Sequence, residues 1–124
     1  MRKAASTLTE QELEIMKIVW DLNQATVRQV YEMLLEQREI AYTTVLTMMQ
    51  ILERKGHLTK SLDDKAHVYR SSKPRQKVIG GMVHEFLQRV FNGSAEPLLL
   101  HLVEDEKLTT QDIDRLRKKL KGKP

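Results

Sequence analysis

The stretch from Ala41 to Gly56, AYTTVLTMMQILERKG, decides the fold of this chain. At about 100° per residue it forms a helix with two unlike faces. One face is apolar and consists of Val45, Met48, Met49 and Leu52. The opposite face carries short hydroxyls, an amide and a guanidinium, on Thr43, Thr44, Thr47, Gln50 and Arg54. An ordinary solvent-facing helix is rich in Lys and Glu, whereas these short groups can approach base-pair edges closely. The helix is therefore predicted to read a DNA groove through Thr43, Thr44, Thr47 and Gln50.

Two helices are predicted before this one, and each begins with a capping box. Thr9-Glu10-Gln11-Glu12 begins the first, which is expected to run to about Leu22. Thr26-Val27-Arg28-Gln29 begins the second, which is expected to end near Glu36. Three short helices joined by tight turns are typical of a helix-turn-helix core.

The segment after Gly56 changes to a period of two, which predicts a β-hairpin from Leu58 to Arg70. Its centre, Asp63-Asp64-Lys65, lacks the glycine of the tightest hairpins, so a looser tip is expected. An ordinary edge hairpin whose lysines keep it soluble is one interpretation. Behind a helix-turn-helix, the pattern favours a wing beside the groove. The residues predicted to contact DNA phosphates are Arg54, Lys60, Lys65 and Arg70.

Three more helices are predicted in the C-terminal part. A long one runs from about Arg75 to Phe91, Ser94 caps a short one, and Thr109 or Thr110 caps the last. They carry more apolar surface than they can bury among themselves, which predicts an intermolecular core in a homodimer. The residues predicted to form it are Val83, Phe86, Leu87, Val90, Phe91, Leu99, Leu102 and Leu116.

The predicted fold class is mainly α with a small β-hairpin. A winged helix-turn-helix domain is expected over residues 1–72 and a three-helix dimerisation domain over residues 73–124. Gly80-Gly81 lies inside the long helix, where it indicates either close packing or a hinge, because two helix-interior glycines cost about 1 kcal/mol each.

The formal net charge of +4 is unevenly spread along the 124 residues. Residues 1–72 hold ten Lys or Arg and ten Asp or Glu, so that part is neutral. From Arg54 to Lys77, however, there are eight basic residues and only two acidic ones. A basic patch of this kind attracts phosphates more than the total charge does, although a solvated mixed-charge surface is the ordinary alternative.

Several kinds of chemistry are not expected. The chain has no cysteine, which excludes disulfides, thiolate metal sites and a cysteine nucleophile and fits a cytoplasmic location. We expect no signal peptide and no membrane span. His84-Glu85 resembles the start of a zinc motif, but Gln88 occupies the position of the second histidine. No metal, cofactor, small-molecule substrate or catalytic residue is therefore predicted, and the chain is not expected to be an enzyme. A protein-interaction module whose winged helix does not read DNA remains the alternative.

Several segments of the chain, taken in order, resemble those of a known family. They are LTEQELEIMKIVW, TVRQVYEML, AYTTVLTMMQILERKGHL, AHVYR, VFNGSAEPLLLHLVEDEKLT and IDRLRKKL. Together they resemble the penicillinase repressor family, which includes methicillin-resistance and copper-transport repressors. The resemblance implies a homodimer that binds a pseudo-palindromic double-stranded DNA operator and represses antibiotic-resistance, transport or stress genes. The family's reading helix falls on Thr43, Thr44, Thr47 and Arg54.

Two departures from the family pattern concern the inducing signal. Copper-responsive members carry a C-terminal cysteine cluster, and this chain has no cysteine. In β-lactam-responsive members, a membrane sensor triggers proteolysis at an Asn-Phe bond, so the resemblance implies a sensor-linked protease as a further partner. Neither Asn23 nor Asn92 precedes Phe, and the nearest matching step is His101-Leu102.

Overall fold

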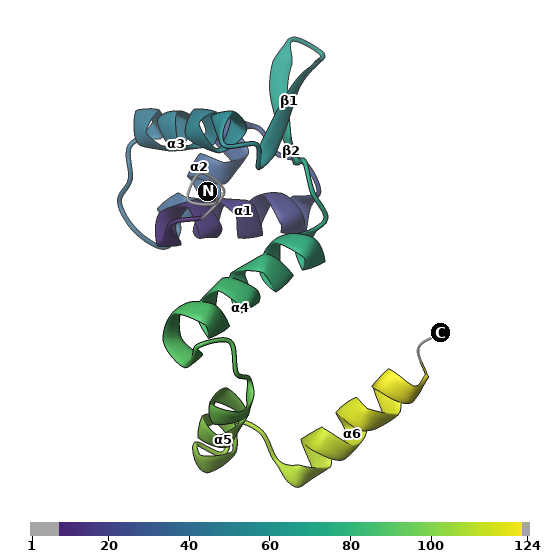
Figure 1. Cartoon of the computed structure of the whole chain (residues 1–124). Coiled ribbons are helices and arrows are strands. Elements are labelled where there is room, and N and C mark those ends of the chain that lie inside the picture. Colours follow the sequence, from purple (N-terminus) through teal and green to yellow (C-terminus); the bar gives the residue numbers. More distant parts are fainter. Residues whose placement is uncertain (1–7, 123–124) are drawn as a thin grey trace. The chain divides into compact units, whose positions relative to one another are not determined.

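The structure, a computed structural model, describes residues 8–122 (Figure 1). The chain forms two compact units, of which the first ends at Ile79 and the second begins at Gly80. The fold class is as predicted, mainly helical with one antiparallel hairpin. The described elements are α1 (Glu10–Leu22), α2 (Val27–Leu35), α3 (Tyr42–Arg54), β1 (Leu58–Asp63), β2 (Ala66–Ser71), α4 (Arg75–Phe91), α5 (Glu96–Glu104) and α6 (Thr110–Lys121).

Both predicted capping boxes of the first unit are confirmed. The Thr9 hydroxyl accepts a hydrogen bond from the Glu12 amide at 3.1 Å, and the Glu12 carboxylate accepts one from the Thr9 amide at 2.9 Å. Thr26 and Gln29 repeat the same exchange at the start of α2. Each box satisfies two backbone donors that a helix start leaves without an intrahelical partner.

The core of the first unit lies between α1, α2, α3 and the base of the hairpin. Apolar side chains at helical spacing fill it, and α3 contributes Val45, Met49 and Leu52, all fully buried. Strand β2 is held against the loop between α1 and α2, because the Ala25 and Tyr69 amides each donate to the other residue's carbonyl, at 3.0 and 2.8 Å. The hairpin is thereby fixed to the helical core.

The tip of the hairpin is tighter than expected. The register pairs Asp63 with Ala66, which leaves only Asp64 and Lys65 in the turn. Both have positive φ, 50° and 73°, as in the two-residue turn whose twist matches that of paired strands. The expectation of a looser tip was wrong, because Asp tolerates the left-handed conformation and the strand pairing holds Lys65 in it.

The helices of the C-terminal part have no core of fully buried side chains. No side chain of α4, α5 or α6 is buried. Thr109 caps α6 with Asp112, as one of the two predicted choices. Ser94 does not cap α5. The N-cap is Ala95, without a side-chain hydrogen bond, and Pro97 lies in the first turn, where its fixed φ suits a helix start.

None of the helices between residues 8 and 122 is both long and apolar enough to span a membrane.

Candidate nucleic-acid interface

The predicted reading residues lie together on the exposed face of α3. Thr43, Thr47 and Gln50 are spaced by four and three residues, so their side chains share one face, and all are exposed. Thr44 lies beside them and is exposed as well. The buried side chains that hold α3 to the core lie on the opposite face. The exposed face offers hydroxyl and amide groups that both donate and accept hydrogen bonds, which is the chemistry that base edges require.

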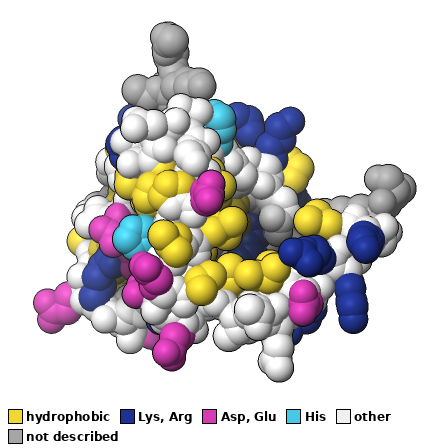
Figure 2. Space-filling view, turned by 60° about the horizontal axis from the view of Figure 1, so that its bottom comes forward, with side chains coloured by type: hydrophobic (Ala, Val, Ile, Leu, Met, Phe, Trp, Pro, Cys, Tyr) yellow, Lys and Arg dark blue, Asp and Glu magenta, His cyan; other side chains and the backbone are white. Residues whose placement is uncertain are grey.

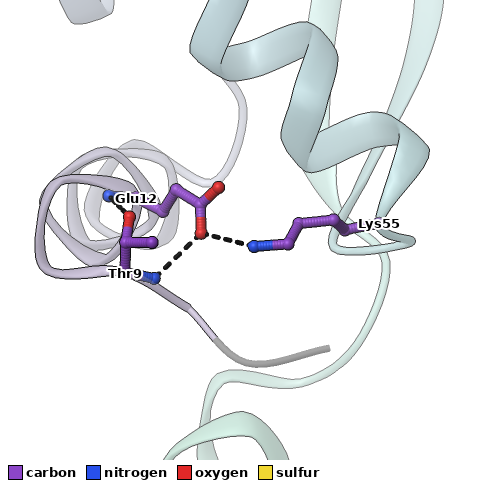
Figure 3. Close-up of polar contacts among 3 residues, drawn as sticks. All are labelled: Thr9, Glu12 and Lys55. Carbon is purple, nitrogen blue, oxygen red and sulfur yellow. Dashed lines mark hydrogen bonds and ion pairs between the residues drawn. The ribbon is translucent and has the colours of Figure 1, made fainter. Parts of the chain in front are cut away.

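The C-terminal end of α3 is attached to the start of α1. The Lys55 ammonium, at the residue that ends α3, lies 2.8 Å from Glu12 Oε1 (Figure 3). Burial acts to raise the pKa of the Glu12 carboxyl, but the hydrogen bonds from Lys55 and Thr9 outweigh it and leave that pKa below its ordinary value. Glu12 is therefore ionised at neutral pH, and its charge helps to orient the reading helix.

Arg54, Lys60 and Lys65, three of the predicted phosphate ligands, are exposed. Arg54 lies on the last turn of α3, and Lys65 lies at the hairpin tip. Lys60 approaches α3, with its ammonium 3.8 Å from the Glu53 carboxylate. An exposed pair at that distance is weak, so the Lys60 charge can still reach a phosphate.

Arg70, the fourth of them, lies apart from Lys60. In the register Lys60 pairs with Tyr69 and Thr59 pairs with Arg70, so Lys60 and Arg70 point to opposite faces of the hairpin. The Arg70 guanidinium donates to Ser61 at 2.9 Å and also to Gln24 in the loop before α2. Its contacts fix the hairpin to the helices, and phosphate binding by Arg70 stays a prediction.

Sequence reasoning missed the cluster of Arg28, Tyr31 and Tyr42. The Arg28 guanidinium carbon lies 5.8 Å from the Tyr31 ring centroid and 5.1 Å from that of Tyr42. The two rings meet edge to face, with centroids 5.4 Å apart. The spacing of Arg28 and Tyr31 on one helix face was a visible signal, but Tyr42 joins them only through the packing of α3 on α2.

The predicted dimerisation residues belong to α4, α5 and α6. Val83, Phe86, Val90, Leu99 and Leu116 are exposed, and Leu87, Phe91 and Leu102 are half-buried. The sequence prediction did not include three further exposed apolar residues, Leu100, Val103 and Leu120. Figure 2 shows hydrophobic side chains next to one another at the surface. On α5, exposed apolar side chains border a hollow of about 490 Å³. It is lined by Ser94, Glu96, Pro97, Leu99, Leu100 and Val103.

Within residues 8–122, no three His, Asp or Glu side chains lie close enough together to hold a metal ion.

A helix-turn-helix core with an exposed hydroxyl face on its third helix and a hairpin wing defines a winged-helix DNA-binding protein. The family model described as penicillinase repressor matches residues 8–122, and the chain belongs to this family. It is accordingly a transcriptional regulator and not an enzyme, as the sequence predicted.

The chain is similar to curated relatives over nearly its whole length. It is 36% identical over 115 residues to the transcriptional regulator BlaI of Mycobacterium tuberculosis, covering 91% of this chain and 82% of that protein. It is 28% identical over 116 residues to the methicillin resistance regulatory protein MecI of Mammaliicoccus sciuri, covering 94% of each.

Solved structures match more than half of the chain. The DNA-binding domain of the repressor BlaI superposes with a TM-score of 0.52 at 25% identity, over 60% of this chain and 90% of that domain. The Bacillus licheniformis BlaI monomer bound to the blaP half-operator superposes with a TM-score of 0.51 at 24% identity, over 56% of this chain and 85% of that one. These likenesses support the winged-helix fold of α1 to β2.

Proposed function

We propose that the protein is a homodimeric repressor that binds a pseudo-palindromic DNA operator through the major groove. The observation that carries this proposal is the exposed face of α3, where Thr43, Thr47 and Gln50 stand together without a covering element. Threonines can approach bases or thymine methyl groups, and glutamine can pair with an adenine. The operator complex of the BlaI monomer, a protein of the same fold, supports this use of the head.

Affinity comes from residues around the reading face. Arg54, Lys60 and Lys65 carry positive charges on the end of α3 and on the hairpin. Contacts of such residues with phosphates fix register without reading sequence, and they release counterions. Specificity and affinity thus reside on different residues of the head, with most of the phosphate ligands on the hairpin.

Two copies associate through the C-terminal helices. A helix of nine to seventeen residues that buries no side chain gains little from its own hydrogen bonds and needs packing to persist. The exposed apolar residues of α4, α5 and α6, together with the hollow on α5, supply a surface for a second copy. A dimer would place two reading helices about 34–36 Å apart, in successive major grooves.

We propose that the regulated genes are those of antibiotic resistance, as the names of the relatives MecI and penicillinase repressor indicate, or genes of transport or stress. The protein would act in the cytoplasm, where chromosomal DNA is found. A sensor-linked protease is a further proposed partner. The step His101-Leu102 lies within α5, so cleavage there would require local opening of that helix.

The test is a selection of random duplexes by the full chain, followed by titration of the enriched operator. Wild type should enrich an inverted repeat. Thr47→Glu should abolish the preference for the enriched operator over random duplex, because its carboxylate would face acceptor-rich base edges. The matched control Thr47→Ser keeps the hydroxyl and should keep this preference. Lys65→Gln should weaken binding to every duplex and lower the slope of log affinity against log salt concentration by close to one unit. Wild-type binding by both Thr47→Glu and Lys65→Gln would contradict the assignment of the groove.

A further inference from the structure

We propose that a hollow between the start of α2, the start of α3 and strand β2 holds one sugar-phosphate unit of the DNA backbone, with Arg28 as its charged ligand. The inference rests on the proposed function and adds a DNA contact outside the reading face and the hairpin lysines. The hollow is lined by Thr26, Val27, Arg28, Tyr42, Leu46, Ala66, His67 and Tyr69.

The size of the hollow suits a nucleotide unit of the backbone. Its volume is about 380 Å³. A single water needs only about 10–15 Å³ of such space, so the hollow can take a group much larger than one water, such as a phosphate together with its sugar.

Arg28 is held in place with its charge available. Its guanidinium lies over the Tyr42 ring, 5.1 Å from the centroid, and 5.8 Å from that of Tyr31. Such stacking orients the planar group and leaves its N–H edges for a ligand. Among the ion pairs that the structure shows between residues 8 and 122, none joins Arg28 to a carboxylate. Its charge is therefore not neutralised by the protein there.

The other lining groups suit an anion with an apolar part. None of the described lining residues is Asp or Glu. His67 can donate a ring N–H whether it is charged or neutral. Val27 and Arg28 lie in the first turn of α2, where backbone amides lack intrahelical partners and the helix dipole is positive. Leu46 and Ala66 offer apolar walls for a sugar.

The position of the hollow points to DNA as the occupant. Tyr42 and Leu46, which line it, directly precede the reading residues Thr43 and Thr47 on α3. A helix lying in the major groove has a sugar-phosphate strand on each side. The hollow adjoins the reading face between α2 and the hairpin, so it would face one of these strands.

The first measurement compares full-length variants in titrations at several salt concentrations. Arg28→Gln should weaken binding to the operator and to random duplex alike, by about tenfold, and should lower the salt slope by close to one unit. Arg28→Lys should recover the slope but only part of the affinity, because an ammonium lacks the planar fork. Lys17→Gln, which removes an exposed charge from α1, is the matched control and should change neither value.

The second measurement locates the contact on DNA. Single neutral methylphosphonates are placed along the operator, and each is titrated with wild type and with Arg28→Gln. At one position the methylphosphonate should weaken operator binding by wild type but cause no further loss of affinity for Arg28→Gln. For His67→Ala, the methylphosphonate at that same position should cost less affinity than it costs wild type. The inference would be overturned if, at every position, the affinity losses from the methylphosphonate and from Arg28→Gln simply added, or if Arg28→Gln bound with wild-type affinity. Either result would leave the proposed function intact. Failure of wild type itself to bind any duplex would overturn both.

Discussion

The Lys55 ammonium donates a hydrogen bond to the Glu12 carboxylate across 2.8 Å, which joins the end of α3 to the first turn of α1, 43 positions earlier. The accepting atom, Oε1, also accepts from the Thr9 amide of the capping box. Only 7% of the Glu12 side chain is exposed, so water weakens this arrangement little. One carboxylate oxygen therefore takes part both in the cap of α1 and in the attachment of the reading helix.

Removal of this carboxylate should destabilise the head. Glu12→Ala loses the carboxylate half of the capping box and the ion pair, and we expect the free energy of unfolding to fall by about 2–3 kcal/mol. Glu12→Gln keeps a cap acceptor and should lose about half as much. The matched control Glu10→Gln changes an exposed carboxylate of the same turn and should cost at most about 0.5 kcal/mol. Urea unfolding measures all three, and equal losses for Glu10→Gln and Glu12→Gln would contradict the role of the pair.

The same carboxylate predicts how stability depends on pH. The folded-state pKa of Glu12 is lowered from 4.5, as the hydrogen bonds from Lys55 and Thr9 outweigh the burial that acts to raise it. A group whose pKa is lower in the folded state stabilises the protein above its unfolded pKa, and this contribution disappears as the pH falls through the folded pKa. The stability difference between wild type and Glu12→Gln should thus be full at pH 7 and shrink below pH 4.5. Urea unfolding at both ends of this range checks it, and a difference that grew with acidity would refute it.

Local features of the fold were predictable from sequence. Thr9 with Glu12 and Thr26 with Gln29 lie three residues apart, and the cap geometry needs nothing beyond that spacing. The two faces of α3 followed likewise from its period. These features depend on the chain within one or two turns, so tertiary packing did not have to be known.

Contacts between distant elements were not predictable. Glu12 meets Lys55, and Arg28 meets Tyr42, only after α1, α2 and α3 have packed together. The turn at Asp64 and Lys65 depends on the strand register, which no residue of the tip itself specifies. Whether Thr43 and its neighbours contact bases remains a prediction, since exposure alone does not identify a ligand.

The hairpin tip predicts opposite effects of one substitution on stability and on binding. Lys65 adopts φ 73°, a conformation that glycine adopts without steric strain. Lys65→Gly should therefore raise the free energy of unfolding by up to about 1 kcal/mol, yet weaken DNA binding because a phosphate ligand is lost. Lys65→Gln, which keeps the strain and removes the charge, should weaken binding equally without the stability gain. Thermal unfolding and salt-dependent titration separate the effects, and a destabilised Lys65→Gly would contradict the assigned turn.

The apolar surface of α5 predicts a variant that separates the subunits. Leu99 is 49% exposed and borders the hollow on α5. Leu99→Glu would place a charge in the proposed interface, and we expect the dimer dissociation constant to rise about 100-fold or more. Leu62→Glu alters a leucine on the hairpin that is 68% exposed, and it should leave association unchanged. Sedimentation over a range of concentrations distinguishes the two variants, and unchanged association of Leu99→Glu would contradict an interface at α5.

Gly80 and Gly81 provide a further test of how α4 is used. Apart from neighbouring residues and the backbone of α4 itself, a Cβ atom added at either position meets no described atom within 4 Å, and both residues lie inside the continuous helix α4. Neither glycine is thus required by contacts with neighbouring side chains of α4. Because alanine favours a helix interior over glycine by about 1 kcal/mol, Gly80→Ala and Gly81→Ala should each stabilise α4, raise the melting temperature and leave the dimer intact. If the pair serves as a hinge, the double variant should also tolerate fewer spacings between operator half-sites than wild type does. Melting curves, sedimentation and titration on spaced half-sites measure these outcomes, and loss of the dimer would instead show that the glycines pack closely against the second subunit.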